Sequence, residues 1–147
     1  MKLYRIYLLL IFTIYSLPQI GNAQILADTI SNWQIYKDSE LMIKSHIVDS
    51  KVHNMVIEKI EKYNKLILYY NYDIIMETIY RQVKFEYGKK TIVVYENNEQ
   101  NTNPINIPKI IVDQAVDGYY NKPIAIIYSD SFSKNETLIG FLEIRYN

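Results

Sequence analysis

The sequence of 147 residues contains no cysteine. This absence excludes a disulfide framework, a thiol nucleophile, a zinc–thiolate site and a lipid anchor on a lipobox cysteine. Small secreted domains of eukaryotes commonly depend on disulfides, so the lack of cysteine favours a bacterial source if the domain is exported. Glycine is scarce as well, with four residues in the whole chain. A phosphate-cradling loop and a dinucleotide-binding fingerprint each need several closely spaced glycines, so both are excluded.

The chain also lacks an excess of charge of either sign. Sixteen basic residues balance sixteen acidic ones, and no basic cluster occurs. Nucleic-acid binding needs a positive footprint, so nucleic acid is not expected as a partner. Long apolar runs are missing apart from residues 6–17. That run is shorter than the ~20 residues that a membrane-spanning helix needs. We therefore expect no membrane-spanning segment in the mature chain, once an N-terminal signal peptide has been cleaved.

The first 23 residues have the three zones of a secretory signal peptide. Lys2 and Arg5 precede the apolar run, and Gly21-Asn22-Ala23 places small residues at a cleavage site before Gln24. The sequence therefore predicts a signal peptide over 1–23 and a single exported β-rich domain over 24–147. The leader carries two basic and no acidic residues, so the mature domain has a formal charge of −2. We expect it to be periplasmic or secreted.

The segment from Ile79 to Glu96 carries the clearest strand pattern, because apolar and polar residues alternate along it. Gly88-Lys89 in its centre is a dipeptide typical of a type II′ hairpin turn. A two-residue turn there predicts these cross-strand pairs: Glu86 with Thr91, Phe85 with Ile92, Val83 with Val94, and Arg81 with Glu96 as an ion pair.

A second hairpin is expected over Trp33 to Val48, with Asp38-Ser39 in its turn, Lys37 beside Glu40 and Ile35 opposite Met42. Residues 65–73 are rich in β-formers and predict a further strand. Residues 52–61 fit a helix face or a strand, since a short apolar run does not separate the two. We favour a strand over 55–60 that pairs with 66–70.

The C-terminal half predicts a polar loop over 96–108, then a short helix over about 108–117 that begins near Pro108 and ends before Gly118. Residues 124–128 and 138–146 predict two more strands, separated by a loop over 129–137. The fold class expected is mainly β: a small antiparallel β-sandwich or half-open barrel of about seven short strands with one short helix.

Candidate catalytic and metal-binding patterns are weak. His46 and His53 lie seven residues apart, which matches neither strand nor helix spacing for a shared metal. Ser131 and Lys134 form a Ser-x-x-Lys match within a predicted loop, where penicillin-binding enzymes have a helix. Oxygen-bearing side chains follow Asp130 without the spacing of a calcium loop. We therefore expect no catalytic residue, no metal and no cofactor. Asp113 and Asp117, one helical turn apart, are predicted to lie on a solvated helix face.

Tyrosine is the most unusual feature, with fifteen residues in the chain. Amphipathic rings suit both the outer face of a sheet and a ligand surface. The candidate ligand-binding residues are Trp33, Tyr69, Tyr70, Tyr72, Tyr80 and Tyr95.

The motifs are generic hairpins and carry no resemblance to a known family. The leading hypothesis is a non-catalytic exported domain that binds another protein or a cell-envelope component, for instance through an edge strand. The alternatives are a carbohydrate or small-ligand binder that uses a tyrosine-rich sheet face, and a small hydrolase that uses carboxylates.

Overall fold

The computed structural model describes residues 32–49, 51–71, 77–133 and 135–146. Within these ranges the chain is mainly β, with two sheets, one short helix and no closed barrel, as expected for a small β-sandwich. The predicted signal peptide over 1–23 lies outside the described residues. No helix in the described part is long and apolar enough to cross a membrane.

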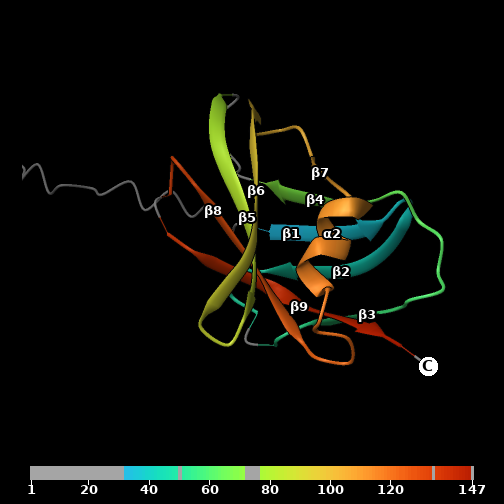
Figure 1. Cartoon of the computed structure of the whole chain (residues 1–147). Helices are drawn as coiled ribbons and strands as arrows, with labels where there is room; N and C mark the ends of the chain where they lie inside the picture. Colours follow the sequence, from blue (N-terminus) through green and yellow to red (C-terminus); the bar gives the residue numbers. More distant parts are fainter. Residues whose placement is uncertain (1–31, 50, 72–76, 134, 147) are drawn as a thin grey trace, which may run out of the picture.

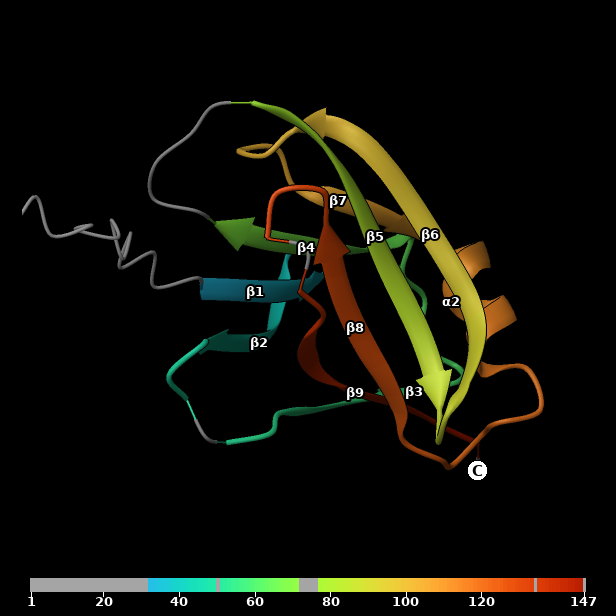
Figure 2. The same cartoon turned by 90° about the vertical axis from the view of Figure 1, so that its left-hand side faces the viewer.

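The first sheet has four strands in the order β2-β1-β4-β7, and every neighbouring pair is antiparallel. Its strands are β1 (Asn32–Lys37), β2 (Glu40–His46), β4 (Lys65–Asn71) and β7 (Ile105–Pro108). In both views the strands of this sheet run across those of the second sheet (Figure 1, Figure 2).

The second sheet has five strands in the order β3-β9-β8-β5-β6. Its strands are β3 (Asn54–Glu58), β5 (Thr78–Tyr87), β6 (Lys90–Gln100), β8 (Ile124–Asp130) and β9 (Thr137–Arg145). The pairing is antiparallel except between β3 and β9, which run parallel. The helix α2 (Lys109–Val116) follows β7 and packs beside β6 and β7 (Figure 2).

The core lies between the two sheets and is centred on three stacked aromatic rings. Tyr70 of β4 lies between Trp33 of β1 and Tyr128 of β8, with ring centroids 6.0 Å and 4.0 Å apart. The indole Nε1 of Trp33 also donates a hydrogen bond to the carbonyl oxygen of Ile139 in β9, at 3.0 Å. The stacking of Tyr70 on Tyr128 and the hydrogen bond from Trp33 to Ile139 therefore join the two sheets.

The hairpin of β5 and β6 has the predicted turn, but its predicted register is wrong beyond the first two pairs. Gly88 has a φ of +63°, as the first position of a type II′ turn requires, and Glu86 lies opposite Thr91. A β-bulge then adds Ile92 to the second strand, so Phe85 lies opposite Val93 and not Ile92. The bulge turns the following odd-numbered side chains of β6 toward the core.

This shift also corrects the predicted ion pair between Arg81 and Glu96. Arg81 is 1 % exposed and lies opposite Asn97, whose Oδ1 accepts hydrogen bonds from Nε at 3.2 Å and Nη2 at 2.5 Å. Glu96 lies on the outer face opposite Gln82. The hydrogen-bond partner that β6 provides for the buried guanidinium is therefore the neutral amide of Asn97 and not the predicted carboxylate of Glu96.

The hairpin of β1 and β2 has the same irregularity. Lys37 lies beside Glu40 as predicted, but Ile35 lies opposite Ile43 and not Met42. The extra residue in β2 turns Ile43 into the core, where an unbroken ladder would have left it on the outer face.

Residues 54–58 form a strand, as favoured, but the predicted pairing with 66–70 is wrong. β3 adds to β9 in the other sheet, because the segment 59–64 crosses from one sheet to the other. The loop predicted over 96–108 is also wrong: β6 reaches Gln100, and β7 pairs with β4 and buries the side chains of Ile105 and Ile107.

The predicted helix is confirmed within one or two residues. α2 begins after Pro108 and ends before Gly118, which has a φ of +76°. Val112, Ala115 and Val116 are buried, as the apolar stripe predicted.

We predict that Gly140→Ala destabilises the protein by about 1–3 kcal/mol. A Cβ at this position in β9 would come within 2.7 Å of the carbonyl oxygen of His53 and 2.8 Å of Ile43 Cδ1. Urea unfolding measures the loss. Leu138→Ala is the control, because it shortens an exposed side chain of the same strand and should lower the stability less. Equal stability of Gly140→Ala and the wild type would contradict the close approach.

Candidate functional site

The five described residues of the predicted aromatic ligand surface do not share one face. Trp33 and Tyr70 are buried in the core stack. Tyr95 is partly buried and packs against the same core from β6. These three rings therefore serve the packing between the sheets.

Two of the others lie on outer faces of different sheets. Tyr69 alternates with buried neighbours on β4 and meets the ring of Tyr36 edge-on, with centroids 5.6 Å apart. Tyr80 is exposed on β5, where the amide of Gln82 donates a hydrogen bond to its hydroxyl at 2.8 Å. Tyr72 lies outside the described residues.

A different set of side chains comes together in a cleft of about 400 Å³ between α2 and the ends of β3 and β9, here called the α2 cleft. Its polar and aromatic lining includes Lys59, Tyr63, Lys109, Asp113, Asp117 and Tyr120. Its size is within the ordinary range of small-ligand sites in proteins.

Tyr63 is the most buried of these aromatic side chains, at 8 % exposed. Its ring lies under the ammonium group of Lys109, with Nζ 5.2 Å from the ring centroid. Burial raises the pKa of the phenol, and the negative charge of Asp113 raises it further. Among the described residues its hydroxyl has no hydrogen-bond partner, so this neutral donor is available to a ligand in the cleft.

Lys109 and Asp113 fix the wall that α2 contributes. Lys109 Nζ lies 2.5 Å from Asp113 Oδ1, one helical turn along. The backbone N–H of Lys109 donates to the carbonyl oxygen of Asn64 at 2.8 Å. The first residue of α2 is therefore tied to the segment that carries Tyr63.

Lys59 and Tyr120 line the cleft together, and Lys59 also contacts the ring of Tyr146, which is not part of the lining. The ammonium group of Lys59 lies 4.4 Å from the ring centroid of Tyr120 and 4.1 Å from that of Tyr146. The backbone N–H of Lys59 donates to the carbonyl oxygen of Arg145 at 2.8 Å, which continues the pairing of β3 with β9. Cation–π attraction thus holds this lysine against the rings.

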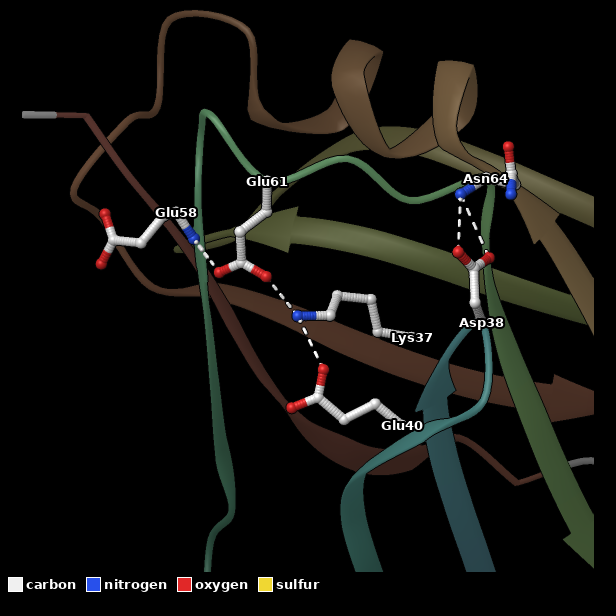
Figure 3. Close-up of polar contacts among 6 residues, drawn as sticks. All are labelled: Lys37, Asp38, Glu40, Glu58, Glu61 and Asn64. Carbon is white, nitrogen blue, oxygen red and sulfur yellow. Dashed lines mark hydrogen bonds and ion pairs between the residues drawn. The ribbon is translucent and has the colours of Figure 1, made fainter.

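The segment 59–64, which supplies both Lys59 and Tyr63, is held from the turn between β1 and β2 (Figure 3). Lys37 donates to Glu61 and forms an ion pair with Glu40 at 2.9 Å. Glu61 also accepts a hydrogen bond from the backbone N–H of Glu58 at 2.9 Å. Lys37 therefore links the hairpin tip to the start of the crossing segment.

Asp38 holds the other end of the same segment. Its carboxylate accepts hydrogen bonds from the backbone N–H of Asn64 at 3.1 Å (Figure 3). It also accepts one from the backbone N–H of Lys65 at 3.1 Å, and the N–H of Asp38 donates to the Lys65 carbonyl oxygen at 3.0 Å. We call Lys37, Asp38, Glu40 and Glu61 the hairpin-tip network. It fixes the position from which Tyr63 enters the cleft.

Sequence reasoning did not find this site. Asp117 is exposed and the Asp113 side chain is 48 % exposed, as predicted for a solvated helix face, but the sequence did not predict that both line the α2 cleft. Lys109 and Asp113 have the i,i+4 spacing of a helical ion pair, so the sequence could have predicted their contact but not the cleft that they line. No periodicity marks Lys59 or Tyr63, because their place depends on the crossing between sheets.

A second hollow of about 320 Å³ lies beside the connection between β2 and β3. Asp49 is its best-connected polar side chain, since its Oδ2 lies 3.1 Å from Nε2 of His53 and accepts a hydrogen bond from Ser45 at 3.3 Å. Ile47 and Val52 line it and are 56 % and 58 % exposed.

The remaining predicted patterns have structural explanations. The carboxylate of Asp130 accepts hydrogen bonds from the backbone N–H groups of Phe132 and Ser133, which closes the turn after β8. Lys134 of the Ser-x-x-Lys match lies outside the described residues. No group of three or more His, Asp or Glu side chains in the described part of the chain is placed to hold a metal ion.

Comparison with known proteins assigns this chain to no family. No family model, no curated protein and no solved structure matches this chain.

We predict that the hairpin-tip network stabilises the protein less at acid pH. The hydrogen bond from Lys37 lowers the pKa of Glu61 below its ordinary value of 4.5, and the same contact raises the pKa of Lys37 above 10.5. A lowered carboxyl pKa stabilises the fold above about pH 4.5, and this contribution is lost as Glu61 becomes protonated. The difference in urea midpoint between the wild type and Glu61→Gln should therefore shrink between about pH 5 and pH 3.

Glu40→Gln is the control for this measurement, because Glu40 is the more exposed of the two carboxylates that meet Lys37. It should change the midpoint less than Glu61→Gln does. A difference for Glu61→Gln that stays constant down to about pH 3 would show that Glu61 does not stabilise the fold through its charge.

Proposed function

We propose that this protein is a non-catalytic binding domain and that its α2 cleft takes a carbohydrate or a ligand of similar size and polarity. The observation that carries the proposal is Tyr63, whose ring is largely buried while its hydroxyl is open to solvent at the cleft and has no hydrogen-bond partner among the described residues. A phenol hydroxyl that no group of the protein engages can donate a hydrogen bond to a ligand in the cleft.

The chemistry of the lining supports this class of ligand. Tyr120 offers an amphipathic ring, while Gln114 and Asp117 offer amide and carboxylate groups. Sugar rings present apolar C–H faces and several hydroxyls, and tyrosine rings with hydrogen-bonding side chains match both. The sequence predicted a carbohydrate ligand on a tyrosine-rich sheet face. We retain this class of ligand and propose the α2 cleft as its binding site.

The place of action is a separate proposal. The charged start, the apolar run and the small residues before Gln24 are typical of a cleaved signal peptide. We therefore propose that the domain works outside the cytoplasm, in a periplasm or beyond the cell.

We predict that Tyr63→Phe weakens carbohydrate binding by about 3- to 10-fold, the value of one neutral hydrogen bond. The ring remains in place under Lys109, so the urea midpoint should not fall. Isothermal titration of the protein with a panel of mono- and oligosaccharides measures the affinity. Trp33 fluorescence is a poor reporter here, because the indole is buried in the core and does not line the cleft.

Tyr87→Phe is the matched control, since Tyr87 is an exposed tyrosine that does not line the α2 cleft. It should leave the affinity unchanged. No heat of binding with any sugar in the panel would rule out the proposed ligand class. Cleavage of a bound oligosaccharide would favour the hydrolase hypothesis, for which Glu58, Asp113 and Asp117 line the same cleft.

A second candidate function is the binding of another envelope protein at the second hollow. Ile47, Val52 and Leu138 line this hollow together, and each is exposed. Neighbouring exposed apolar side chains are typical of protein interfaces. This observation supports the partner-binding hypothesis independently of the α2 cleft.

We predict that Val52→Lys abolishes capture of any such partner from envelope extract, because the new ammonium group would be desolvated in the interface. Capture is measured by pull-down, with the partner identified by mass spectrometry. Val94→Lys is the control, as an exposed β-branched side chain elsewhere on the surface. Equal capture by the wild type and Val52→Lys would place the interface elsewhere.

A further inference from the structure

We infer that the ligand of the α2 cleft carries a protonated amino group, as an amino sugar does, and that Asp117 binds this group at the C-terminal end of α2. This inference rests on the proposed function, since it names the class of ligand for the same cleft. It follows from which charged groups of the cleft are already engaged and which are not.

Both lysines of the cleft are engaged within the protein. Lys109 forms its ion pair with Asp113, and Lys59 lies against the rings of Tyr120 and Tyr146. Asp117 forms no ion pair and accepts no side-chain hydrogen bond among the described residues. Among the charged groups of α2 and its C-cap, the carboxylate of Asp117 is therefore the one that can form an ion pair with a ligand.

The helix itself adds to this negative charge. Asp117 is the C-cap of α2, and the last turn of the helix carries no basic residue. A helix C-terminus has a partial negative charge, so a carboxylate there is unfavourable and a cation is favourable. A ligand ammonium group would relieve this unfavourable placement of Asp117.

Tyr63 supplies an independent observation from a different element. Its side chain is more than nine-tenths buried, comes from the segment between β3 and β4, and lines the cleft that Asp117 also lines. A hydroxyl donor and a carboxylate in one cleft can bind a sugar hydroxyl and an ammonium group at the same time. Neither α2 alone nor the acidic residues alone would provide this combination.

The test compares three sugars that share a ring and differ at one carbon. Glucosamine carries an ammonium group there, glucose a hydroxyl and N-acetylglucosamine a neutral amide. Each is titrated into the full protein, and NMR chemical shifts give the affinity. We expect glucosamine to bind about fivefold more tightly than the two neutral sugars, the strength of one partly exposed charge pair.

Asp117→Asn should remove this preference and leave the affinity for glucose unchanged. The control Glu86→Gln removes a carboxylate from the outer face of β5, where Glu86 bonds Thr91, and should keep the preference. If all three sugars bind equally, or if Asp117→Asn keeps the preference, the inference is wrong and the proposed function stands. If neither these three sugars nor any mono- or oligosaccharide of the panel binds, the proposed function itself is wrong.

Discussion

The contact on which the rest of the structure depends is the stack of Trp33, Tyr70 and Tyr128 between the two sheets. Each strand has one face to bury, so the sheets must present their apolar faces to one another. The hydrogen bond from Trp33 to the Ile139 carbonyl oxygen adds a directional constraint to this packing. Two of the six aromatic residues predicted as a ligand surface, Trp33 and Tyr70, therefore belong to this core.

The α2 cleft is a consequence of how the chain crosses between these sheets. β3 belongs to one sheet and β4 to the other, so the segment 59–64 bridges them at one end of the sandwich. Lys37 and Asp38 hold that bridge from the neighbouring hairpin tip, and Lys109 ties α2 to it. Tyr63 thus enters the cleft from a segment that is fixed on both sides.

Local patterns predicted much of the fold. Pro108 and Gly118 bounded the helix, Gly88 placed a hairpin turn, and alternation marked the strand of Ile79 onward. The registers were wrong by one residue, because bulges in β2 and β6 depend on which faces the assembled core requires. The pairing of β3 with β9 joins segments more than eighty residues apart, which no local pattern encodes.

The sequence by itself determined the β-rich class, the position of the helix and two of the turns, because backbone preferences act over a few neighbouring residues. Its lack of cysteine and of basic clusters also limited the possible functions. Only the tertiary structure decided which tyrosines are buried and which line a cleft. Lys59 and Tyr63 come from the crossing segment and Asp117 from the end of α2, and only the packing of α2 against that segment brings them together.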